Sequence, residues 1–181
     1  MLALCLKNLK PKVMKRVIIL ILLAVNSISY SQTEIVQREP FALKLIVNDK
    51  EPYEMNVAKT DYFIQKKVLQ IYPSEKLNIE VEVKNDTIYS MKVVDQNVNP
   101  KKTMRIEFIQ NVKNDRGAGM TLAIQNPFDK RLNYDAAMFV VGHNKELVPT
   151  TVLPIQPNKV NLEKWDDVIV TLVLDRWRFE N

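Results

Sequence analysis

The chain has 181 residues, of which 46% are hydrophobic and 26% charged, with one Cys and one His. This composition argues against transition-metal and thiol chemistry, which need more such ligands. The formal net charge of +5 comes from five basic residues among the first 31, since the rest has 21 Lys and Arg against 21 Asp and Glu. A neutral remainder lacks the basic surface of nucleic-acid-binding proteins and the excess charge that holds proteins on anionic membranes.

The first 31 residues have the organisation of a secretory signal peptide. Basic residues precede the apolar block Val17–Val25, and the small residues Ser29 and Ser31 follow it. The nine residues of this block are too few for a membrane span, which needs about 20. We therefore expect cleavage after Ser31, a mature chain starting at Gln32, and export to the bacterial periplasm or the medium without stable membrane insertion.

Two other residues of this segment affect the expected mature protein. Met14 is an alternative start to Met1, because Met14-Lys15-Arg16 and the apolar block already make a complete signal. Cys5, the single cysteine, lies before the apolar block, where the acylated cysteine of a lipoprotein does not occur. The mature chain is thus expected to be soluble, unlipidated and free of cysteine.

Residues 32–181 are expected to form a single domain, because no composition shift divides them and their length suits one hydrophobic core. Apolar residues alternate with polar ones over most of this region, which predicts half-buried strands. In chain order the predicted strands are 41–47, 53–57, 68–72, 77–84, 88–95, 104–108, 120–125, 132–141, 147–155 and 168–174.

Some segments of this pattern are distinctive. Residues 59–67 fit either a short helix or a strand, 111–117 read as a loop, and 161–164 are expected to form one helical turn. Prolines in 147–155 remove backbone donors and suit an edge strand. Val168–Leu174 is apolar on both faces, which predicts a central strand with Val170 and Leu172 in the core.

The strongest local signal is Gly119–Val141, in which two alternating runs flank a dense turn sequence. Asn126 can close an Asx turn, Pro127 sets the φ of the next turn position, and Asp129 and Lys130 keep the tip in water. The sequence therefore predicts strand, turn and strand here.

The same residues carry a resemblance to a known class of domain. The pattern Leu122-x-Ile124-x-Asn126-Pro127-Phe128-Asp129-Lys130-x-Leu132-x-Tyr134 resembles the successive-strand signature of immunoglobulin-like β-sandwich domains in exported bacterial proteins. The resemblance implies a sandwich fold and supplies no catalytic residue. Together with the strand pattern, it leads us to expect an all-β, antiparallel, immunoglobulin-like β-sandwich of about 8–10 strands.

Few residues suggest chemistry. His143 follows Gly142 at a strand end and is expected to be an exposed turn residue, because no partner for a triad or zinc site accompanies it. Asp166 and Asp167 lack the surrounding ladder of oxygen ligands of a calcium loop. We expect no metal and no cofactor.

Aromatic residues remain as binding candidates. Phe128 at the hinge tip is the most conspicuous apolar residue expected to be exposed, unless its ring folds back over the end of the sandwich. Trp165 and Trp177 could either stack on sugars or seal the sandwich. We therefore predict a noncatalytic module that binds a protein or glycan at the cell envelope through loops near Phe128 or Trp165. The alternative is a small exported hydrolase whose carboxylates converge only in the fold.

Overall fold

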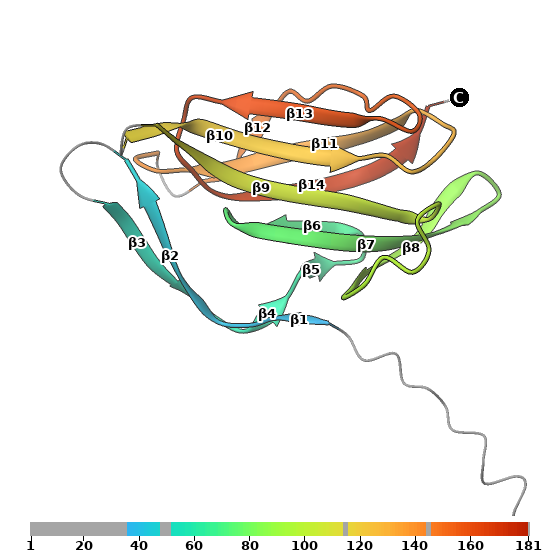
Figure 1. Ribbon diagram of the computed structural model, residues 1–181, viewed down its shortest axis with the longest axis horizontal. Coiled ribbons are helices and arrows are strands. Elements are labelled where there is room, and N and C mark those ends of the chain that lie inside the picture. Colours follow the sequence, from blue (N-terminus) through green and yellow to red (C-terminus); the bar gives the residue numbers. More distant parts are fainter. Residues whose placement is uncertain (1–35, 48–51, 114–115, 144–145, 181) are drawn as a thin grey trace, which may run out of the picture. The chain divides into compact units, whose positions relative to one another are not determined.

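The computed structural model describes residues 36–47, 52–113, 116–143 and 146–180, all of which belong to one unit, Ile35–Asn181. The expected signal peptide and its cleavage site after Ser31 lie outside the described residues. The described residues form fourteen strands and no helix (Figure 1), so the predicted all-β class is confirmed. None of their elements is a helix with the length and apolar character needed to cross a membrane.

The strand bounds follow the chain order. They are β1 (Gln37–Arg38), β2 (Phe41–Ile46), β3 (Pro52–Val57), β4 (Thr60–Asp61), β5 (Phe63–Gln65), β6 (Val68–Ile71), β7 (Glu75–Lys84), β8 (Thr87–Val94), β9 (Thr103–Lys113), β10 (Arg116–Gln125), β11 (Leu132–Val140), β12 (Val148–Thr150), β13 (Val160–Trp165) and β14 (Ile169–Phe179).

Ten of these strands form two antiparallel five-stranded sheets, an arrangement consistent with a β-sandwich (Figure 1). The strand order is β13-β10-β9-β7-β8 in one, here the β9 sheet, and β12-β11-β14-β6-β5 in the other, the β14 sheet. Alternate side chains of both sheets meet in one apolar core, as Met120, Leu122 and Leu172 illustrate with 0% exposure. The alternation in the sequence thus predicted which residues face the core.

The predicted hinge between β10 and β11 is confirmed. The Phe128 N–H donates to Asn126 Oδ1 at 3.0 Å, which is the Asx turn. Asn126 is fully buried, and its Nδ2 donates to the carbonyls of Lys130 (2.8 Å) and Ile155 (3.1 Å). The hinge does not make a hairpin, because β10 belongs to the β9 sheet and β11 to the β14 sheet.

The hairpin expected around 41–57 is present as β2 and β3, but it belongs to neither large sheet. Its buried residues Leu43, Leu45 and Val57 form a second apolar cluster with Val170 of β14. A register shift between β11 and β14 leaves Val170 without a partner in β11, so Val170 lies in this second cluster while Leu172 lies in the main core, and β14 is covered on both faces. The prediction of a central strand with buried Val170 and Leu172 is therefore confirmed.

Other local predictions were wrong or were left open by the sequence. Residues 161–164 lie in strand β13 rather than in a helical turn, because pairing with β10 satisfies the backbone and places Asn161 and Glu163 on the core side. The open segment 59–67 contains the short strands β4 and β5. The loop expected over 111–117 is much shorter, since β9 runs to Lys113 and β10 starts at Arg116.

Candidate functional site

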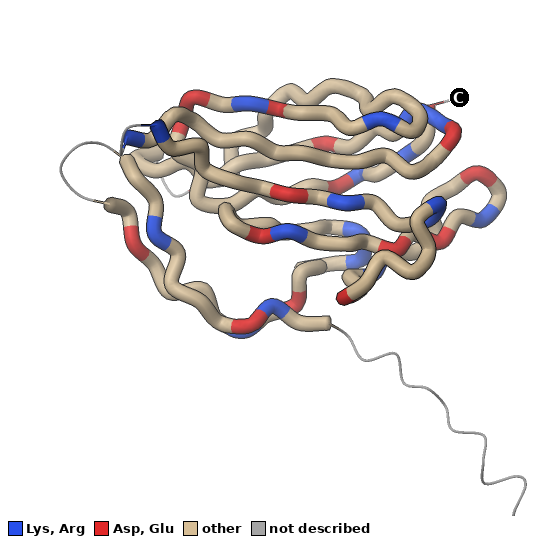
Figure 2. Tube along the Cα trace, in the orientation of Figure 1, with Lys and Arg blue, Asp and Glu red and all other residues tan. Residues whose placement is uncertain are grey.

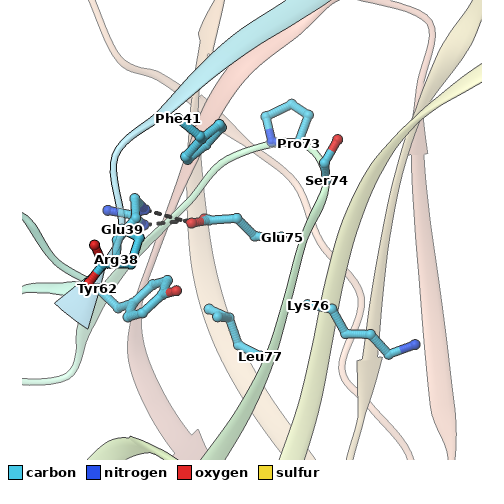
Figure 3. Close-up of a pocket in the computed structure, with 9 residues that line it drawn as sticks. All are labelled: Arg38, Glu39, Phe41, Tyr62, Pro73, Ser74, Glu75, Lys76 and Leu77. Atoms are coloured by element: carbon cyan, nitrogen blue, oxygen red, sulfur yellow. Dashed lines mark hydrogen bonds and ion pairs between the residues drawn. The ribbon is translucent and has the colours of Figure 1, made fainter. Parts of the chain in front are cut away.

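Two surface hollows bring charged and aromatic side chains together in the described part of the chain. The first, here the Arg38 pocket, has a volume of about 320 Å³ (Figure 3). It is lined by Arg38, Glu39, Phe41, Tyr62, Pro73, Ser74, Glu75, Lys76 and Leu77.

Arg38 is the most buried charge of this pocket, with 1% exposure. Its Nε and Nη2 donate to the two carboxylate oxygens of Glu75 at 2.6 and 3.2 Å, in the bidentate geometry that guanidinium and carboxylate favour. Nη1 donates to Thr60 Oγ1 at 2.9 Å, and Nη2 also donates to the Gln70 carbonyl at 2.7 Å. The charge of Arg38 is therefore fully engaged within the protein.

Two tyrosine rings enclose the same guanidinium. The Arg38 Cζ lies 4.6 Å from the centroid of Tyr62 and 4.8 Å from that of Tyr72, within the range of cation–π attraction. Burial raises the pKa of both tyrosine hydroxyls, and the positive charge of Arg38 partly opposes that shift. These contacts join β1 to β4, β6 and β7. The Arg38 pocket is therefore better explained as a structural contact that holds β1 in place than as a ligand site.

The second hollow, here the hinge cavity, is larger, with a volume of about 410 Å³. Its walls come from the end of β7, the turn after it, the connection from β8 to β9, the hinge and the end of β14. The lining residues are Val81, Glu82, Val83, Lys84, Asp86, Lys101, Lys102, Phe128, Asp129, Lys130 and Phe179.

Charges at the hinge cavity are partly paired. Glu82 lies 3.1 Å from Lys84 Nζ and accepts a hydrogen bond from Ser90 Oγ at 3.0 Å. These bonds from Lys84 and Ser90 hold the pKa of Glu82 below its usual range. Asp86 pairs with Lys130 at 2.8 Å.

Two lysines of the hinge cavity stand apart from these pairs. Lys101 and Lys102 are exposed, and within the described residues neither lies in an ion pair. Elsewhere Lys and Arg are interspersed with Asp and Glu over the described chain (Figure 2). The cavity thus combines aromatic side chains with two lysines outside the ion pairs, of which Lys102 also attracts Glu82 and helps to lower its pKa. Both ammonium groups can meet an anionic group.

Phe128, one of the two predicted binding residues, lies in the wall of the hinge cavity. Of the two orientations that the sequence left open, the structure shows the one folded back over the sandwich end, because only 9% of Phe128 is accessible. The Asx turn directs the ring inward against Phe179, at a centroid distance of 5.1 Å and an interplanar angle of 76°. Phe128 can therefore offer a ligand only a small edge of its ring.

Trp165, the other predicted binding residue, is the last residue of β13 and lies away from the hinge. It pairs with Met120 in the middle of β10, whereas Asn126 follows the end of that strand. Trp165 is half-buried, and its Nε1 donates to Thr150 Oγ1 at 3.0 Å. The structure thus does not bring Phe128 and Trp165 into one site.

The remaining candidates are dispersed. Trp177 is buried and stacks on Tyr134 at a centroid distance of 5.0 Å, so it does not form an exposed sugar platform. His143 and the Asp166-Asp167 pair are exposed in turns. Among the residues that the structure describes, no three His, Cys, Asp or Glu side chains gather as potential metal ligands.

Sequence reasoning found Phe128 but missed the other residues that define the two hollows. Arg38 and Glu75 are 37 positions apart, and neither stands in a recognisable motif. The adjacent Lys101 and Lys102 were a weak signal, which gains meaning only when Phe128 and Phe179 are found beside them.

Comparisons with known proteins give no relative. No family model matches the chain, and no curated protein and no solved structure matches it either.

Proposed function

We propose that this protein is an exported, noncatalytic module that binds a protein or a glycan at the bacterial cell envelope, through the hinge cavity and without a cofactor. After export it has no stable membrane insertion and no nucleic-acid partner. The two antiparallel sheets and the hinge motif support an immunoglobulin-like sandwich as its scaffold.

The hinge cavity is the observation that carries this proposal. Its volume of about 410 Å³ falls within the range of about 300–1,000 Å³ that is common for ligand sites. Phe128 and Phe179 supply apolar surface, while Lys101 and Lys102 can recognise a carboxylate or another anion. Three separate segments position these side chains, namely the hinge, the end of β14 and the connection from β8 to β9, as expected of a binding site on a rigid scaffold.

A hydrolase is the alternative, and Glu82, Asp86 and Asp129 are the carboxylates that line the cavity. Glu82 and Asp86 each bind a lysine ammonium, and the pKa of Glu82 is lowered. A general acid needs a carboxyl group whose pKa is raised. The electrostatics of the cavity therefore favour binding over acid catalysis.

The test compares two charge-matched double variants. Lys101→Glu/Lys102→Glu alters the hinge cavity, whereas Lys66→Glu/Lys113→Glu changes two exposed lysines outside its lining. The first variant should lose binding to envelope polysaccharides or to crosslinked envelope proteins by at least about tenfold, the effect of one lost charge-assisted contact. The second variant should bind as the original protein does.

Two results would contradict the proposal. Equal binding by both double variants would remove the hinge cavity as the site. Turnover of a glycoside or ester that Glu82→Gln abolishes would favour the hydrolase instead. The export step is tested separately, since the intact mass of the exported protein should begin at Gln32.

A further inference from the structure

The four edge strands of the two large sheets are protected to different degrees. In the β14 sheet, β12 has three residues with Pro149 among them, and β5 has three residues with a register shift. In the β9 sheet, β8 is longer, but Lys67 Nζ donates to its Ile88 carbonyl at 2.9 Å and a bulge interrupts its pairing. Short strands, proline, lysine and bulges are the usual means of blocking an edge.

The fourth edge, β13, has none of these features within its six residues except Lys164 near its end. Its outer face carries Val160 and Leu162, which are 58% and 56% exposed. An unblocked strand with exposed aliphatic residues is a template for adding another strand.

The ladder between β10 and β13 shows which backbone groups of β13 remain free. The Asn126 N–H donates to the Lys159 carbonyl in the same register as the β10–β13 pairs. Because hydrogen-bonded and non-hydrogen-bonded pairs alternate in an antiparallel ladder, Asn161, Glu163 and Trp165 bond to β10. The N–H and C=O groups of Val160, Leu162 and Lys164 therefore point to the free edge, where no other described segment bonds to them.

The sequence of β13 is complementary to itself in one antiparallel register. With Asn161 opposite Asn161 of a second copy, each Val160 faces a Leu162 on the outer side. On the other side each Lys159 faces a Glu163, so that opposite charges meet twice. The neighbouring register places Leu162 opposite itself and Val160 opposite Lys164, which loses both matches.

We propose that β13 pairs with β13 of a second copy of this chain, antiparallel and centred on Asn161, so that two β9 sheets join across the edge. The free N–H and C=O groups of Val160 in each copy then bond to those of Leu162 in the other copy. The exposed aliphatic side chains of these residues cover one another. This pairing is independent of the hinge cavity and of the proposed function.

Sedimentation velocity of the purified protein over a range of concentrations tests the pairing. A dimer is expected. Leu162→Lys and Leu162→Pro should each weaken it by at least about tenfold, the first through charge and the second by removing an N–H that β10 does not use. Val98→Lys is the matched control, because Val98 is 70% exposed but lies in the connection from β8 to β9, outside β13.

A single cysteine tests the register. In a Cys5→Ser background, Asn161→Cys places two thiols on the symmetry axis in a non-hydrogen-bonded pair, where Cα atoms lie about 4.5 Å apart and a disulfide can close. Mild oxidation should give a covalent dimer, and Leu162→Cys should crosslink poorly.

Several outcomes would overturn the proposal. In sedimentation, they are a monomer at every concentration, a dimer that both Leu162 variants leave intact, and a monomer whose β13 binds only an added extended peptide. In crosslinking, the contradicting outcome is that Leu162→Cys crosslinks efficiently and Asn161→Cys does not. Melting temperatures of all variants separate loss of pairing from loss of folding.

Discussion

The main core and the N-terminal segment, residues 36–61 with β1 to β4, are held by different kinds of contact. The core joins two sheets through apolar side chains such as Leu122 and Leu172, and its members have near-zero exposure. The described part of the N-terminal segment buries Leu43, Leu45 and Val57 in a smaller cluster with Val170, and Phe41, Tyr53 and Met55 pack against that cluster. Polar contacts add to this packing.

Two sets of polar contacts, made by Arg38 and Gln110, attach the N-terminal segment to the two sheets. Arg38 binds Glu75 and two other groups, as described above. The side-chain amide of Gln110 accepts from the Ile46 N–H at 2.9 Å and donates to the Ile46 carbonyl at 2.8 Å, as a neighbouring strand would. Apolar contacts are non-directional and many, whereas each polar contact depends on one partner. The N-terminal segment should therefore be sensitive to few residues, and the core to any large polar change.

The largest effect is expected in the core. Leu172→Asp places an unpaired carboxylate among apolar side chains at a position of 0% exposure, and should unfold the domain by costing more than about 4 kcal/mol. Urea denaturation measures the loss. A small change would show that β14 is not central to the core.

The next effect concerns the fastening of the N-terminal segment. Arg38→Met leaves Glu75 largely buried without its cation, and should cost about 3–5 kcal/mol. Hydrogen exchange should show β1 and β4 opening while β10 and β14 stay protected. Arg38→Met/Glu75→Leu is the control, because removing both charges should recover much of the loss; no recovery would mean that the contacts to Thr60 and Gln70 dominate.

Removing an unpaired polar group from the core should change the stability less, and in the opposite direction. The Tyr134 hydroxyl is buried and lacks a hydrogen-bond partner among the described residues. Tyr134→Phe removes this cost while keeping the ring on Trp177, and should leave stability unchanged or raise it by about 1 kcal/mol. A clear loss in urea denaturation would indicate that the hydroxyl has a partner.

The same residue predicts a pH dependence. Burial raises the pKa of Tyr134 above its usual range in the folded protein, so the unfolded chain ionises first as the pH rises through about 10. The contribution of Tyr134 is therefore fully present below pH 10 and is lost as the pH rises further. Urea midpoints between pH 8 and 11 should fall less steeply for Tyr134→Phe, although Tyr62 and Tyr72 still contribute.

The smallest effect is expected on the solvated face of β7. Glu82 is exposed, and its bonds to Lys84 and Ser90 are screened by water. Glu82→Lys should leave the urea midpoint within experimental error. A loss of stability as large as that of Arg38→Met would contradict the distinction between solvent-exposed charges and the buried Arg38–Glu75 pair.

The sequence by itself determined the local structure of the sandwich. Alternation identified the core faces of β7 and β10, because side chains of a strand point to opposite sides in turn. Asn126 and Pro127 identified the hinge, because an Asx turn needs only neighbouring residues. Both patterns depend only on residues a few positions apart, so they can be recognised in the sequence alone.

Only the tertiary structure decided how these elements combine. Residues 161–164 became a strand because β10 offered partners, and the strands on either side of Asn126 entered different sheets. Arg38 pairs with Glu75, which is 37 positions away in the sequence. The ring of Phe128 packs against Phe179, which is also distant in the sequence. Such pairings depend on the register and order of distant strands, and the period-2 pattern is the same whichever strand becomes the neighbour.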